Sequence, residues 1–228
     1  PYRDFTPLIQ LEDDLGNILA RTEPYMTLTD AWRAGETLMQ RIAITVPPAT
    51  PPGDYHVRVT WVARASDAYL SYLDSAGLAG IWAEVGIVTV LRPDFFPNAS
   101  TIETLIIHDI QISSDFRLIG YTGNEQSYRP GEMISMALYW KASAEGQQPV
   151  TITARLGTTP LEQWMPFDGY VWHEGETLAE RHRFMLPRDL PGGDYSLFLN
   201  DEMLTTVHIE GVAREFELPP IDNLLNIV

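Results

Sequence analysis

The sequence predicts an all-β protein of two tandem antiparallel β-sandwiches, the first lacking its N-terminal strands. Three observations support this fold class: a stretch of 24 residues occurs twice, short strand-like segments alternate with Gly and Pro, and no long helical period is present. The repeat aligns Trp32–Tyr55 with Trp172–Tyr195 at a shift of 140 positions, without a gap, and 11 of the 24 positions are identical. We therefore expect two copies of one structural unit.

The repeated stretch reads as a turn, a strand and a corner. Trp-x-x-Gly-Glu is typical of a turn in which Gly supplies backbone freedom, and Arg129–Glu132 carries the same theme a third time. The predicted strands, 37–46 and 177–186, end at Pro-rich bends because Pro lacks the N–H that a central strand donates. The positions expected to build turn and corner are Trp32, Gly35, Glu36, Gly53 and Tyr55 in copy one, and Gly175, Glu176, Gly193 and Tyr195 in copy two.

The Gly-Asp-Tyr sequence after each bend predicts an immunoglobulin-like topology. It is similar to the corner before the penultimate strand of such sandwiches, where a Tyr hydroxyl donates to the backbone upstream. We expect the corner Tyr residues to make this hydrogen bond. We also expect each copy to bury its own aromatic side chains, with the regions around Trp32 and Trp172 folded alike.

Alternating apolar residues and turn residues place the other strands. A hairpin is predicted around 12–17, and residues 64–84 form either a helical turn or a hairpin around 74–77. In the strand predicted at 133–141, one face carries Ile134, Met136, Leu138 and Trp140. The remaining predicted strands cover 7–10, 18–20, 57–62, 85–91, 105–112, 116–121, 150–156 and 204–210.

The repeat also sets the expected boundaries: unit one at 1–92, a Pro-rich linker at 93–102, unit two at 103–213, and a tail at 214–228 that resembles the start of a further unit. Unit two has about 45 residues before its strand at Val150, whereas almost nothing precedes Pro7 in unit one. We expect the chain to be a fragment of a longer protein. We further expect residues 216–228, or a neighbouring molecule, to pair with unit one.

The composition of the chain excludes several classes of partner and of site. The net charge of −16 disfavours nucleic acid and anionic membrane surfaces as partners. The chain has no Cys, which excludes disulfides, thiolate catalysis and Cys-based zinc sites. Because 45% of the residues are hydrophobic, real cores are expected, yet no apolar run is long enough for a membrane span.

No catalytic, metal or cofactor motif stands out, so we expect a non-enzymatic protein without cofactors. The five His residues lack ligand spacing, and His56, His108 and His208 fall at surface positions of predicted strands. Glu12, Asp13 and Asp14 lack the spacing of an EF-hand and predict a solvated turn instead. Paired carboxylates of a hydrolase stay open, since their geometry is tertiary.

The aromatic residues are the one candidate for ligand binding. Trp164, Tyr170 and Trp172 gather around one predicted loop, where exposed rings could form a platform for a glycan. The competing interpretation places these rings in the sandwich interior. An exposed row of Trp and Tyr would distinguish a carbohydrate-binding module from a structural unit.

Several motifs together resemble a known family: Leu-x-Asp-x-x-Gly at 11–16, Trp-x-x-Gly-Glu at 32–36 and 172–176, Phe-Arg-Leu-Ile-Gly-Tyr at 116–121, Arg-Pro-Gly-Glu at 129–132 and Leu-Tyr-Trp at 138–140. The chain looks like the tandem extracytoplasmic β-sandwich repeats of Chloroflexota proteins of unknown function. Such repeats often follow the membrane region of dolichyl-phosphate-mannose-type glycosyltransferases.

The resemblance implies an extracytoplasmic or cell-surface spacer or interaction module, as an accessory region of a membrane-anchored glycosyltransferase or of a cell-envelope assembly. Its partners would be proteins or neighbouring repeat units. It implies no catalytic residues here. Two alternatives remain: a carbohydrate-binding module, and a filament or complex subunit that uses strand addition.

Overall fold

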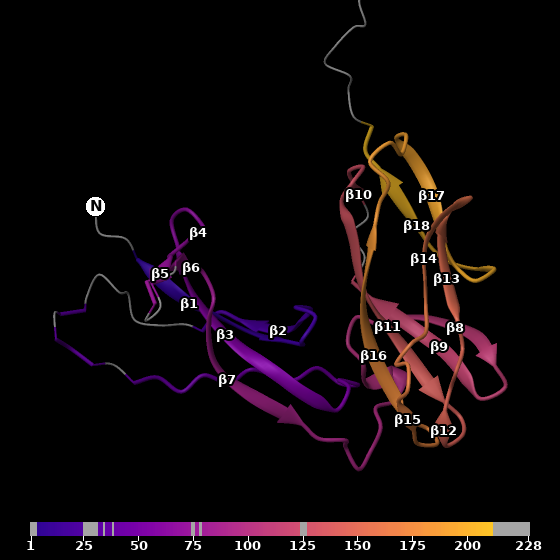
Figure 1. Cartoon of the computed structure of the whole chain (residues 1–228), viewed down its shortest axis with the longest axis horizontal. Coiled ribbons are helices and arrows are strands. Elements are labelled where there is room, and N and C mark those ends of the chain that lie inside the picture. The colour runs from indigo at the N-terminus through magenta and orange to yellow at the C-terminus, as the bar shows by residue number, and fades with distance from the viewer. Residues whose placement is uncertain are drawn as a thin grey trace, which may run out of the picture.

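The structure, a computed structural model, describes residues 4–24, 32–33, 35–37, 39–73, 76–77, 79–123 and 127–211. The described residues form 18 β-strands and one 3₁₀ turn, with no α-helix among them (Figure 1). The all-β class predicted from the sequence is therefore confirmed. The strands before the linker are β1 (Phe5–Glu12), β2 (Ile18–Thr22), β3 (Gly53–Ala63), β4 (Ala68–Tyr69), β5 (Tyr72–Leu73), β6 (Ala79–Gly80) and β7 (Ala83–Val90).

Residues after the linker supply the other eleven strands. The 3₁₀ turn, Ala99–Thr101, leads into β8 (Ile106–Ser113), β9 (Phe116–Thr122), β10 (Ser127–Tyr128), β11 (Met133–Ala142), β12 (Gly146–Gln147), β13 (Ile152–Leu156), β14 (Thr159–Trp164), β15 (Val171–Trp172), β16 (Thr177–Met185), β17 (Gly193–Leu199) and β18 (Glu202–Ile209).

Unit two is a two-layered sandwich. One sheet has the order β10-β18-β17-β13-β14 and the other β16-β11-β9-β8. Both contribute to one apolar core, in which Trp140 stacks on Phe116 and Trp172 meets the same ring edge-on. As predicted, Ile134, Met136, Leu138 and Trp140 all point into this core. The predicted sandwich is therefore present in unit two, while an immunoglobulin-like topology stays a prediction.

Unit one has one main sheet, with β3 at its centre. β1 and β7 flank β3, and β2 continues the sheet beyond β1, all antiparallel. The order β7-β3-β1-β2 matches β18-β17-β13-β14 of unit two, so the repeat extends to topology. The insert forms a small hairpin in which β5 pairs with β6, which supports the hairpin alternative for 64–84.

The predicted strand at 37–46 is wrong. Among the described residues of this stretch none belongs to a strand, whereas the counterpart stretch in unit two forms β16. The physical reason is the missing partner: β16 is built by its ladder with β11, from Lys141↔Thr177 to Met133↔Met185. No described strand of unit one corresponds to β11.

The expectation that both copies bury their aromatics is also wrong. Trp172 is 1% exposed in the core of unit two, whereas Trp32 is 36% exposed and meets Trp61 edge-on. The turn and the corner are alike in the two units, but among the described residues a second sheet covers the Trp at this position in unit two alone.

No described helix is long and apolar enough to span a membrane. Residues 212–228 lie outside the described residues, and the predicted pairing of 216–228 with unit one stays a prediction.

Candidate functional site at the junction of the units

The three Gly-Glu turns share one geometry. In each, the Glu backbone N–H donates to the carbonyl three residues earlier: Glu36 to Arg33, Glu132 to Arg129, and Glu176 to His173. In each turn the Glu carboxylate also accepts a hydrogen bond from the backbone N–H of the residue three positions earlier, at 2.9, 2.7 and 2.8 Å. The Gly before each Glu has φ between 79 and 85°, the left-handed region that Gly adopts without strain.

Both corner tyrosines form the predicted hydrogen bond. The Tyr55 hydroxyl donates to the Pro51 carbonyl at 2.8 Å, and the Tyr195 hydroxyl donates to the Pro191 carbonyl at 3.0 Å. Burial, and the nearby negative charge of Asp13, raise the pKa of Tyr55 to about 12. The corner thus fixes the entry into β3 and β17 in the two units.

One of the three turns is also an anchor between the units. Glu176 is fully buried, and its Oε1 lies 3.0 Å from Nε of Arg92, which follows β7 of unit one. The Tyr170 hydroxyl donates to the same carboxylate at 2.8 Å and accepts from Arg92 Nη2 at 2.6 Å. Arg92 also donates to the Val171 carbonyl, and hydrogen bonding to Tyr170 raises its pKa. Arg92 therefore fixes the chain at the point where it leaves unit one.

A second contact joins the bend of unit one to the edge of a unit-two sheet. The Ala49 carbonyl accepts from the backbone N–H of Ala179 at 2.7 Å. β16 is the edge strand of its sheet, so this bond occupies an edge N–H that would otherwise face water. Ala49 packs with Ile102 and Tyr139 in a small apolar cluster on the outer face of that sheet.

A third contact comes from the Arg that is identical in both copies of the repeat. Nη2 of Arg181, on β16, donates to the carbonyl of Leu19 on β2 at 2.7 Å. Arg183 reaches the carbonyl of Leu15 in the neighbouring turn at 3.5 Å. Burial lowers the pKa of Arg181. The hairpin of unit one thus lies against β16, as Figure 1 shows.

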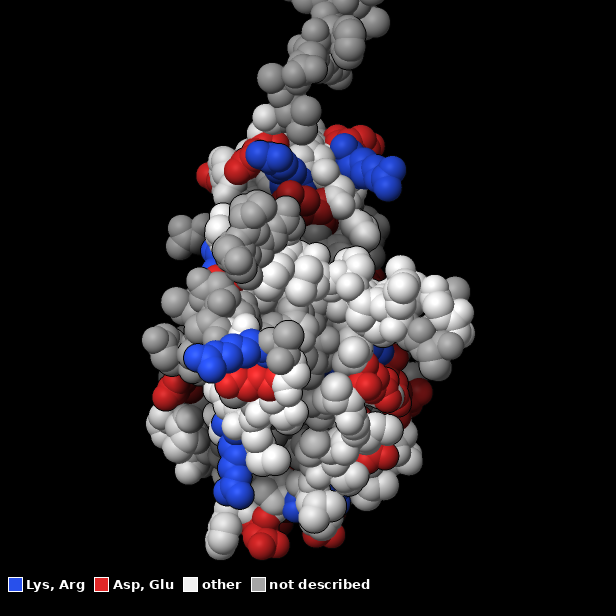
Figure 2. Space-filling view, turned by 90° about the vertical axis from the view of Figure 1, so that its left-hand side faces the viewer, with Lys and Arg blue, Asp and Glu red and all other residues white. Residues whose placement is uncertain are grey.

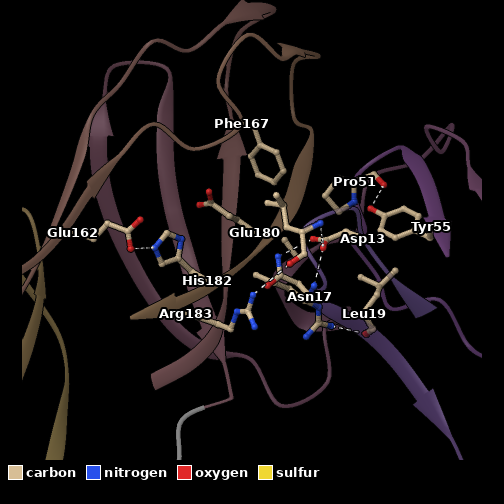
Figure 3. Close-up of a pocket in the computed structure, with 13 residues that line it drawn as sticks. Asp13, Asn17, Leu19, Pro51, Tyr55, Glu162, Phe167, Glu180, His182 and Arg183 are labelled. Carbon is tan, nitrogen blue, oxygen red and sulfur yellow. Dashed lines mark hydrogen bonds and ion pairs between the residues drawn. The ribbon is translucent and has the colours of Figure 1, made fainter. Parts of the chain in front are cut away.

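Between these contacts lies a pocket of about 610 Å³, drawn in Figure 3. Unit one lines it with the turn after β1 and with the corner at Pro51 and Tyr55. Unit two lines it with Glu162, Phe167 and residues 179–183. This junction is the candidate functional site, because both units are needed to form it.

The carboxylates of the pocket already have partners. Glu180 accepts from Nε1 of Trp140 at 2.8 Å and from Nε1 of Trp164 at 3.1 Å, and burial raises its pKa. Because Trp140 and Trp164 belong to different sheets, Glu180 ties the two layers of unit two together. Glu162 lies 3.0 Å from Nε2 of His182.

On the unit-one side of the pocket, Asp13 shapes the turn. Its carboxylate accepts from the backbone N–H groups of Leu15 and Asn17 at 3.0 and 2.8 Å. This agrees with the predicted turn at 12–17. No group of three or more His, Asp or Glu side chains suited to a metal ion occurs among the described residues.

The predicted glycan residues do not form a platform together. Trp172 lies in the core, and Tyr170 is held by Arg92 and Glu176. Trp164 is half-buried, with its ring stacked on His182 at a centroid distance of 4.1 Å. The three residues thus offer no exposed row of rings, and glycan binding stays a prediction.

Sequence reasoning missed Arg92, Ala49 and Glu180. Arg92 is the last residue of the predicted unit one and Ala49 lies in its Pro-rich bend, and their partners lie in the other unit. The identity of Arg41 and Arg181 in the repeat was the one available signal for the junction.

No protein-family model matches this chain, and no similar protein was found among curated proteins.

Proposed function

We propose that the chain is a non-catalytic extracytoplasmic spacer and interaction module, whose junction holds successive repeat units at a fixed angle. One observation carries this proposal. The contact between the units is built from main-chain groups and from an ion pair whose carboxylate is buried, at Ala49–Ala179, Arg181–Leu19 and Arg92–Glu176. Hydrogen bonds are directional, so these contacts restrain rotation of one unit against the other more than apolar contact alone would.

The surface of unit one supports the interaction part of the proposal. Most of the exposed large hydrophobic side chains belong to residues 15–95, and several gather on the insert: Tyr69, Leu70, Tyr72, Leu73 and Ile81. Figure 2, which views the molecule from this side, shows a broad uncharged area between the charged groups. Exposed apolar patches of this kind are typical of protein interaction sites.

The family resemblance supports the extracytoplasmic placement, with a membrane-anchored glycosyltransferase or an envelope assembly as the larger context. The glycan-binding alternative has weaker support, because Trp172 is buried and Tyr170 is engaged at the junction. Immunogold labelling of intact cells, with permeabilised cells as the control, tests the placement. Labelling that requires permeabilisation would contradict it.

Rotational diffusion tests the rigid junction. ¹⁵N relaxation should give both units of the full chain one common correlation time. Ala49→Trp should separate the correlation times, because Ala49 is buried against Tyr139 and leaves no room for an indole. Thr45→Trp, at an exposed position of the same segment, should leave them equal. Independent tumbling of the units in the unmodified chain would refute the spacer function.

A further inference from the structure

The inner faces of the two main sheets are equivalent in sequence but differ in burial. In unit one, Val88 lies opposite Tyr55 in the antiparallel ladder, and in unit two Val207 lies opposite Tyr195. Val88 and Val207 are therefore equivalent positions. Val88 is 40% exposed and Val207 is 0% exposed. The difference continues along β3, where Val57 and Val59 are half-buried while the counterparts Leu197 and Leu199 are fully buried.

This half-buried face of unit one is apolar, whereas the opposite face mixes apolar residues with polar and charged ones. Residues that lie opposite one another in the ladders share a face. One face is apolar and includes Ile9, Leu11, Val57, Val59, Trp61, Val88 and Val90. The other face carries the ion pairs His56–Glu84 and Arg58–Glu12. The apolar set is therefore the inner face of a sandwich.

Unit two shows what covers such a face. Its inner face lies under β8, β9, β11 and β16. In unit one, the described residues provide only the segment 39–47, which is equivalent to most of β16 and the two residues after it. Ile44 of this segment packs on Leu11 and Tyr55, but Val46 is 38% exposed where its counterpart Leu186 is 1% exposed. A Cβ added at Gly86 of β7 would meet no atom within 4 Å.

We propose that the inner face of unit one binds a three-stranded antiparallel β-block of the same repeat type, supplied by another polypeptide segment. Its last strand would pair antiparallel with residues 39–45, in the register that joins Met133–Tyr139 to Ala179–Met185 in unit two. Its inward positions would alternate large apolar residues, as Ile134, Met136, Leu138 and Trp140 do.

A second copy packed face to face is the less suitable occupant. Such a dimer would cover the apolar side chains but would give the 39–47 segment no strand partner. A β-block satisfies both needs, because it adds main-chain hydrogen bonds along the segment and covers the face behind it. The apolar surface is also continuous with a groove of about 400 Å³ at the junction, lined by Val46, Val90 and Phe96. This inference stands independently of the spacer function.

Hydrogen exchange of the full chain tests the proposal. The probe is a polypeptide with the sequence of residues 103–148, added in excess. It should slow amide exchange in 39–47 and in β7 by about tenfold or more, and it should displace a hydrophobic dye. The control probe carries Leu138→Glu and Trp140→Glu, which place charge on the inward face. It should protect neither segment.

Two further variants of the chain make the outcome decisive. If the free probe does not fold, residues 103–146 are joined directly ahead of Pro7, in the register of the repeat. Unchanged exchange in 39–47 in this tethered form would overturn the proposal. The second variant lacks residues 214–228. If amides of 39–47 are protected from exchange in the full chain and lose this protection on deletion, the tail occupies the face and the proposal is overturned. Protection that depends on protein concentration would assign it to a second copy.

Discussion

The guanidinium of Arg92, at the end of unit one, forms an ion pair with the fully buried carboxylate of Glu176 in a turn of unit two. Arg92 itself is partly exposed, so the pair reaches from the surface into the interior. Removing one partner of such a pair leaves a charge that water cannot reach.

Arg92→Met should therefore lower the free energy of unfolding of unit two by about 2–3 kcal/mol. The loss is moderated because Tyr170 and the His173 N–H still donate to Glu176. Urea unfolding followed by Trp fluorescence measures it. The control is Arg129→Met, which breaks the exposed pair with Glu210 and should cost much less, because water solvates both groups. Equal losses for both variants would contradict the anchoring role of Arg92.

Tyr55→Phe should lower the free energy of unfolding by about 1 kcal/mol, because it deletes the hydrogen bond to Pro51 and little else. The raised pKa of Tyr55, about 12, also gives a pH signature. The native state holds this proton more tightly than the unfolded state does. The contribution of Tyr55 is therefore complete below pH 10 and disappears as the pH rises through 12.

NMR titration of ¹³C-labelled Tyr should show one ring that ionises near pH 12 and is missing in Tyr55→Phe. Tyr195→Phe serves as the matched variant, since it removes the equivalent bond of unit two. A Tyr55 resonance that titrates near pH 10 would contradict the burial of this corner.

Glu180→Gln should change the pH dependence of stability. Burial raises the pKa of Glu180, so the native state binds its proton more tightly than the unfolded state. The stability of the unmodified chain relative to Glu180→Gln should therefore rise as the pH falls from 7 through the folded pKa toward 4.5, and level off below. Chemical unfolding at closely spaced pH values measures this difference. A pH-independent difference would mean that Glu180 is solvated.

Gly175→Ala should destabilise unit two by about 1–2 kcal/mol. Its φ of 79° is unfavourable for Ala, while a Cβ would meet no atom within 4 Å, so the cost is backbone strain alone. Gly86→Ala is the control, because it has equal room without the positive φ and should be neutral or slightly stabilising. Thermal unfolding of both variants gives the comparison.

The sequence was sufficient to predict features that depend on neighbours along the chain. The turns, the Tyr corners and most strands were placed correctly, because Gly, Pro and alternating apolar residues act locally. It failed at 37–46, where the residues favour a strand but a ladder also needs a partner. For the same reason the junction could not be predicted, because no residue near Arg92 or Ala49 in the sequence indicates contact with Glu176 or Ala179.

The aromatic cluster illustrates the other limit. Trp164, Tyr170 and Trp172 are neighbours in sequence, but a strand, a loop and a second short strand direct them differently. Trp172 points into the core, Tyr170 toward Arg92, and Trp164 toward Glu180. Composition can show that rings are available, while their direction depends on tertiary packing.

The bond from Ala179 to Ala49 is made by the main chain alone, and so it does not depend on which small side chains occupy those positions. Exchange of one small side chain for another at either position would therefore leave this link between the adjoining units in place.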